Sequence, residues 1–103
     1  MIHLHSELGK LKNLIPTKNV KDINTKVIEI KLHCDTLINE HGKHSDVGKE
    51  LERIVWALRN IHLLLTKNTI VFDKLLKIVE AVENKHIKRI TELLDIESKE
   101  IKT

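Results

Sequence analysis

Residues 20–37 read VKDINTKVIEIKLHCDTL, and the spacing of their apolar side chains predicts the fold. An apolar residue recurs every third or fourth position, which is the repeat of a helix that presents one seam to a partner helix. The alternation that is typical of a β-strand does not fit a run of this length. We therefore expect a helix over residues 18–41, which Gly42 ends. Its seam consists of Val20, Ile23, Val27, Ile30, Cys34 and Leu37.

A second seam of the same kind follows within a few residues. His41-Gly42-Lys43-His44 has the composition of a tight connection, and Ser45 is a typical helix N-cap. A helix over residues 46–66 then carries the repeat. A short turn between two helices of similar length predicts an antiparallel helical hairpin. The apolar positions of this helix are Val47, Leu51, Ile54, Leu58, Ile61 and Leu65.

The N-terminal segment, residues 2–14, predicts a short helix that Pro16 stops. A helix of this length is marginal in water, so it has to dock on the rest of the chain.

The region that follows Leu65 allows two interpretations. Residues 66–69 (TKNT) are weak helix formers and favour a turn, after which a helix would cover residues 70–97. Alternatively, one helix continues from residue 46 to 97, roughly 78 Å long, and needs a second chain to cover it. The heptad repeat favours the second interpretation, because it continues without interruption. The repeat runs through Asn68, Phe72, Leu75, Val79, Val82, His86, Arg89, Leu93 and Ile96.

In the continuous helix, Asn68 would be a buried polar residue that fixes register and oligomeric state. We favour the break at residues 66–69, and we expect a frayed tail over residues 98–103. If chains associate, the seam between them would use Asn68, Phe72, Leu75, Val79 and Val82.

The sequence as a whole predicts a single all-α domain, a small antiparallel helical bundle with coiled-coil-like packing that forms homo-oligomers. Cys34 is the only cysteine, so an internal disulfide is excluded. Neither a secretory signal nor an apolar run long enough to span a membrane is present, and we expect a cytoplasmic protein. The Lys/Ile/Asn-rich composition is typical of small phage and mobile-element proteins, so a viral protein is one expectation.

The residues that could carry chemistry do not form a known catalytic or metal-binding pattern. Cys34 lies near His33, His41 and His44, but a structural zinc site needs paired ligands at short spacing, and here there is one cysteine. Cys34 and His41 are seven residues apart, about 10 Å along a helix, which is too far for proton transfer. We expect neither an enzyme nor a cofactor or metal site.

A partner-binding surface is the functional expectation that remains. Trp56 is the single tryptophan and lies off the main seam. It either covers the edge of the core or anchors a partner protein, since tryptophan is enriched at the centres of protein interfaces. Arg53, Arg59 and Asn60 lie near it by helical spacing. The leading hypothesis is a helical interaction module that binds and modulates a partner protein.

The alternative hypothesis is a protein that binds an anion, a nucleotide or a nucleic acid. The hairpin with Glu52, Trp56, Ala57 and Ile61 resembles phage-encoded sponges that sequester cyclic nucleotides from bacterial immune systems. This resemblance covers less than half of the chain, and the spacing around the turn departs from it. It implies an anion-binding role, for which Arg53 and Arg59 could act with the lysines of the first third of the chain. These are Lys10, Lys12, Lys18, Lys21, Lys26 and Lys31.

Overall fold

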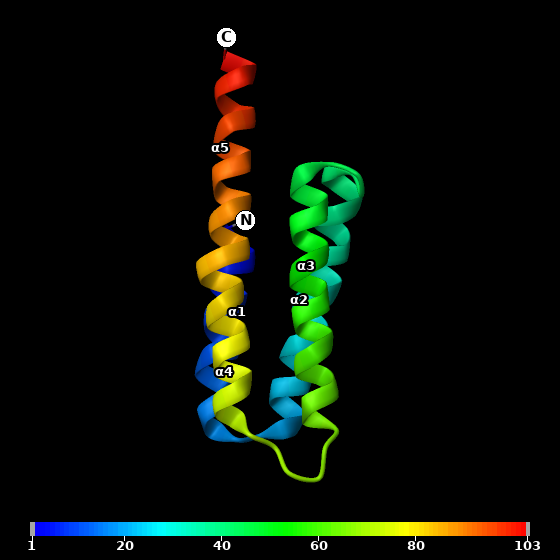
Figure 1. The fold of residues 1–103 in the computed structure, drawn as a ribbon, viewed down its shortest axis with the longest axis vertical. Coiled ribbons are helices and arrows are strands. Elements are labelled where there is room, and N and C mark those ends of the chain that lie inside the picture. The colour runs from blue at the N-terminus through cyan, green and yellow to red at the C-terminus, as the bar shows by residue number, and fades with distance from the viewer. Residues whose placement is uncertain (1, 103) are drawn as a thin grey trace.

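The computed structural model confirms the predicted class: the chain is an all-α bundle whose helices pack against each other. It describes the backbone of residues 2–102 and the side chains of residues 3–95. Helices run alternately down and up the long axis (Figure 1). The elements are α1 (Ile2–Leu14), a 3₁₀ turn η1 (Ile15–Thr17), α2 (Val20–His41), α3 (Asp46–Leu65), α4 (Phe72–Ala81), a π-helical turn η2 (Val82–Ile87) and α5 (Lys88–Lys102). The predicted frayed tail, residues 98–103, lies outside the residues whose side chains are described.

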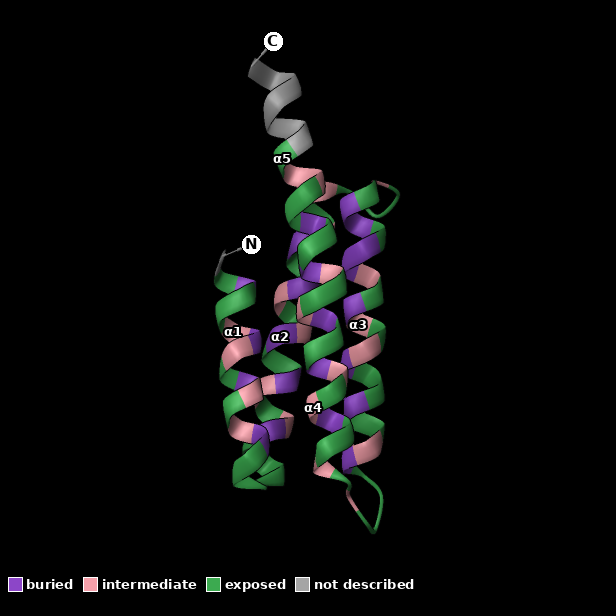
Figure 2. Cartoon of the chain, turned by 60° about the vertical axis from the view of Figure 1, so that its left-hand side comes forward, coloured by how far each residue is buried: buried purple, intermediate pink, exposed green. Residues whose placement is uncertain are grey.

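The helices form a ring in which each one contacts two neighbours. The α2–α3 hairpin forms the most extensive pair, α1 packs on α2 and α4, and α3 packs on the long unit made by α4, η2 and α5. The inward faces are buried stripes along every helix (Figure 2). Both predicted seams of the hairpin lie in this core, apart from Val20 at the start of α2, which is exposed. The short helix α1 contributes three residues of zero exposure, Leu4, Leu8 and Leu11, and the turn η1 adds Ile15.

The α2–α3 turn is built from two glycines and one serine. Gly42 ends α2 at φ 94°, a left-handed conformation that glycine adopts without steric cost. The Ser45 side chain accepts a hydrogen bond from the Gly48 N–H at 3.0 Å and donates one to the Gly42 carbonyl at 2.7 Å. Gly48 lies directly below that carbonyl, where a Cβ atom would collide with it. The turn therefore brings two helix ends closer together than any larger residue at position 48 would allow.

The chain leaves the helical conformation between Leu65 and Phe72. The Thr66 hydroxyl donates to the Leu63 carbonyl at 2.7 Å, which satisfies one of the free acceptors at the end of α3. Asn68 lies exposed in this connection, so it does not occupy a buried seam. The uninterrupted heptad across residues 66–69 therefore does not correspond to a continuous helix, because the chain reverses direction there and forms the fourth side of the bundle (Figure 1).

The π-helical turn η2 changes which residues of the last helix face the core. Buried positions follow the expected repeat through Val82 and then move to Ile87 and Ile90. The repeat read from the sequence instead placed His86 and Arg89 on this face, and that expectation is wrong: His86 is half-buried at the edge and Arg89 is exposed. A π turn accommodates one extra residue, so every later side chain moves by one position around the helix.

Within residues 2–102, no helix combines the length and apolar character needed to cross a bilayer.

Candidate protein-binding surface

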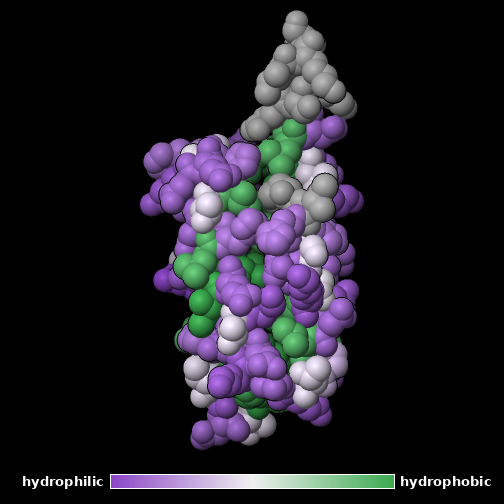
Figure 3. All heavy atoms as spheres, turned by 180° about the vertical axis from the view of Figure 1, so that it is seen from behind, coloured by the Kyte–Doolittle hydropathy of each residue, from purple (hydrophilic) through white to green (hydrophobic). Residues whose placement is uncertain are grey.

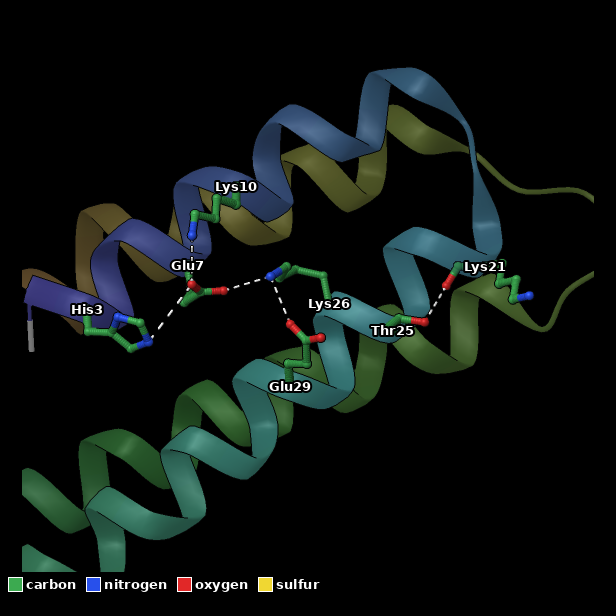
Figure 4. Close-up of polar contacts among 7 residues, drawn as sticks. All are labelled: His3, Glu7, Lys10, Lys21, Thr25, Lys26 and Glu29. Atoms are coloured by element: carbon green, nitrogen blue, oxygen red, sulfur yellow. Dashed lines mark hydrogen bonds and ion pairs between the residues drawn. The ribbon is translucent and has the colours of Figure 1, made fainter.

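Three of the six N-terminal lysines form ion pairs within the bundle. Lys26 of α2 reaches Glu7 of α1 at 2.8 Å and Glu29 at the same distance, and Lys10 contacts Glu7 at 3.1 Å (Figure 4). Hydrogen bonds from Lys26 and Lys10 lower the pKa of Glu7 to about 2. Lys12 pairs with Glu83 of η2 at 3.4 Å. These ion pairs connect α1 to its two neighbours, and they leave less positive charge for an external anion than the sequence indicates.

Trp56 lies on the outward face of α3 with 62% of its surface exposed. The Arg59 guanidinium carbon sits 5.3 Å from the centroid of its ring, a cation–π distance. Both residues border an open hollow of about 560 Å³ between α2 and α3. The other lining residues have mixed charge: Lys31, Asp35, Ile38, Asn39, Lys43, Glu52 and Val55. This hollow offers an aromatic anchor with polar groups of both signs around it.

The four residues predicted to bind a partner do not lie in one hollow. Trp56 and Arg59 face α2, whereas Arg53 lies on the opposite side of α3 and borders a hollow of about 390 Å³ against η2 and α5. Asn60 lines a third hollow, between α3 and α4. All four side chains are exposed. The four residues lie on one helix, as predicted. Because α2 packs on one side of α3 and α5 on the other, Trp56 and Arg59 border a different hollow from Arg53.

Further apolar side chains are exposed on the two helices of the hairpin. Leu63 follows Trp56 by seven residues on the same outward stripe of α3, with Asn60 between them, and is 60% exposed. On α2, Ile28 and Leu32 are 46% and 59% exposed. Apolar surface interrupts the otherwise hydrophilic rear face of the molecule (Figure 3). Five of the six large apolar residues that are exposed in the described part of the chain thus lie on the two helices of the hairpin.

Glu50 is a buried carboxylate that was not among the predicted site residues. It accepts hydrogen bonds from Arg53 on its own helix and, at 3.1 Å, from His86 Nδ1 of η2 when that nitrogen carries a proton. Burial raises the pKa of Glu50, but the hydrogen bonds to His86 and Arg53 outweigh it, and the net pKa lies below its ordinary value. Only the π turn brings His86 to this position, so the pair could not be read from residue spacing.

The predicted oligomer seam is largely covered by the chain itself. Leu75, Val79 and Val82 are buried in the core and Phe72 is half-buried, while Asn68 lies in the connection. A second chain could reach the three buried residues only if the bundle opened. Self-association through these residues stays a prediction. In the closed bundle Leu75, Val79 and Val82 are not accessible to a second chain.

The cysteine and the histidines do not form a metal-binding cluster among the described residues. Cys34 is buried in the core, where burial raises the pKa of its thiol to about 12. His33 contacts His3 edge-to-face, with ring centroids 5.0 Å apart, and His44 is exposed in the turn. Among the described residues, no three His, Cys, Asp or Glu side chains are arranged to hold a metal ion.

Comparisons of the chain with protein-family models, with curated proteins and with solved structures found no match.

Proposed function

We propose that this protein is a non-enzymatic helical interaction module that binds a partner protein through the outer face of α3. The exposure of Trp56 carries the proposal. A side chain of this size is costly to leave in water, and a small bundle with a closed core has no folding requirement for it there.

The surroundings of Trp56 support the proposal. Arg59 stacks on the Trp56 ring, and Leu63 adds a second exposed apolar side chain seven residues, or about two helical turns, further along α3. An aromatic residue with an arginine beside it, in a hollow with a polar rim, is the composition of a protein-binding hot spot. The backbone beneath is a regular helix that packs against its neighbours along its length, so the anchor is presented without an ordering cost.

Photo-crosslinking from position 56 tests the proposal. The full-length protein would carry an aromatic photoreactive amino acid in place of Trp56, which keeps a ring at that position, and a matched protein would carry it at Lys21, which is exposed on α2. We expect a defined protein product from position 56 alone. The identified partner should then bind the W56A variant at least about tenfold more weakly than the wild type. Equal products from both positions, or unchanged affinity of W56A, would contradict the proposal.

A second candidate function is binding of a nucleotide or another small anion. The observation that favours it is that Lys31 and Arg59 border a smaller hollow of about 270 Å³, together with His62 and an apolar floor of Val27, Ile28 and Leu58. Calorimetric titration with cyclic di- and trinucleotides at low and high salt would test it. Saturable binding that R59A abolishes would establish this function, and no measurable heat at either salt concentration would exclude it.

A further inference from the structure

An open hollow lies between α3 and α4, beside the connection that joins them. Its volume is about 790 Å³. The apolar part of its lining comes from Leu63 and Leu64 of α3 and Ile78 of α4, and this apolar part predominates. From Asn60 to Thr66 the wall advances by about 9 Å, or nearly two helical turns. The hollow is thus an elongated apolar trough, open to solvent.

The charged residues of this trough are all lysines. Lys67 of the connection and Lys74 and Lys77 of α4 line it, and no carboxylate does. The hollows around Trp56 and Arg53 differ in this respect, because each contains acidic as well as basic side chains. Three ammonium groups at the rim of one apolar trough repel each other in the free protein. A ligand that brings negative charge would remove that repulsion.

We propose that this trough binds the apolar face of an acidic amphipathic helix from a partner protein. The inference rests on the proposed function and names the class of partner. A helix that docks in a groove inserts apolar side chains at positions i, i+3, i+4 and i+7, a span of about 10 Å, which matches the length of the wall. Glutamate or aspartate residues along both flanks of that helix would meet Lys67 on one side and Lys74 and Lys77 on the other.

The lining disfavours the other occupants that a basic surface attracts. Single-stranded nucleic acids are typically bound by aromatic side chains on which bases stack, and none lines the trough. A membrane surface binds a protruding basic and apolar face, whereas here the apolar residues lie in a depression between two helices. Leu63 belongs both to this trough and to the exposed stripe that carries Trp56, so one partner could contact the two surfaces together.

Fluorescence anisotropy with synthetic peptides tests the inference. The probe is a labelled amphipathic peptide of about 18 residues, or five turns, with leucine at the face positions and glutamate elsewhere. One control peptide has the same composition in an order that spreads the leucines around the helix. A second keeps the amphipathic order and replaces glutamate by lysine. We expect the full-length protein to bind the first peptide at least about tenfold more tightly than either control.

Charge reversal locates the site. The double variant K74E/K77E should lose at least about tenfold in affinity for the acidic amphipathic peptide. The matched variant K21E/K49E changes the net charge equally at exposed sites away from the trough, and should lose less than about threefold. Far-UV circular dichroism of both variants shows that the bundle is intact. A variant that keeps the lysines, L63D, should also weaken binding, because it places a charge in the apolar trough.

Several results would overturn the inference. Equal binding of the scrambled peptide would mean that charge alone attracts the ligand. Equal losses in the two double variants would place the site elsewhere. Binding of anionic vesicles or single-stranded DNA that depends on Lys74 and Lys77, with none of the peptide, would assign the surface to a membrane or a nucleic acid. If crosslinking from position 56 captures a partner but the peptide does not bind, the inference fails and the proposed function stands. If the peptide binds and position 56 captures nothing, the role of Trp56 fails instead.

Discussion

Deletion of Asn84 should leave the fold intact, although it removes a residue from the middle of a helix. In a regular α-helix, one deleted residue rotates everything that follows by about 100°. Asn84 is exposed and lies within the π-helical turn η2, where one extra residue is already accommodated. Without it, Val82 and Ile87 are four positions apart rather than five. The buried repeat then becomes continuous, and Ile87 and Ile90 keep their places in the core.

The magnitude follows from a matched deletion in α3. Asn60 is also an exposed asparagine, but it lies within a regular α-helix. Its removal would rotate Ile61 and Leu65, which are 0% and 7% exposed, out of the core. Each buried side chain of this size contributes about 1.5–3 kcal/mol, so the deletion of Asn60 should cost about 3–6 kcal/mol. Deletion of Asn84 should change the free energy of unfolding by less than about 1 kcal/mol, because no buried apolar residue leaves the core.

Urea denaturation followed by far-UV circular dichroism is the assay. Tryptophan fluorescence would change little on unfolding, since Trp56 is already exposed in the folded protein. The wild type should be stable by about 5–15 kcal/mol, so the Asn60 deletion should either shift the urea midpoint far more than the Asn84 deletion or leave the chain unfolded without urea. If the two deletions lower the free energy of unfolding equally, η2 does not accommodate one extra residue. An extra residue then does not explain why Ile87 and Ile90, rather than His86 and Arg89, lie in the core.

The remaining predictions concern single side chains. G48A should destabilise the protein by at least about 1 kcal/mol, because the new Cβ atom would collide with the Gly42 carbonyl. G9A has open space around the new Cβ atom and should stabilise the protein by up to about 1 kcal/mol. Urea midpoints of the two variants that shift in the same direction would contradict this explanation of the turn. E7Q should cost about 1–2 kcal/mol at neutral pH. The pKa of Glu7 is lowered to about 2 by Lys26 and Lys10, so the carboxylate stabilises the fold above its ordinary pKa. That contribution is lost as the pH falls from about 4.5 to about 2, and a variant whose deficit persists unchanged at acid pH would refute the ion-pair explanation. Cys34 should react with a water-soluble thiol reagent only at the rate of unfolding, because burial raises its pKa to about 12; fast labelling in native buffer, compared with labelling in urea, would show that the core is accessible.

The sequence alone predicted the class of fold. Apolar residues at alternating spacings of three and four describe one buried stripe per helix, and Gly42 with Ser45 marks the turn between two stripes. These signals are local, since each depends on residues within one or two helical turns. The place of Trp56 outside the buried seam of its own helix also followed from spacing.

The register of the last helix and the division of the α3 surface were decided by tertiary packing. The same repeat allowed His86 or Ile87 to face the core. In the closed bundle Ile87 is buried and His86 lies beside Glu50, an arrangement that contains one π turn. The free-energy cost of such an irregular turn cannot be read from the spacing of apolar residues along the chain. Likewise, Arg53 and Arg59 are six residues apart on α3, yet α5 and α2 pack on either side and assign them to different hollows. Spacing within a helix determines which side chains share its face, while the neighbours that cover each edge of that face come from distant parts of the chain.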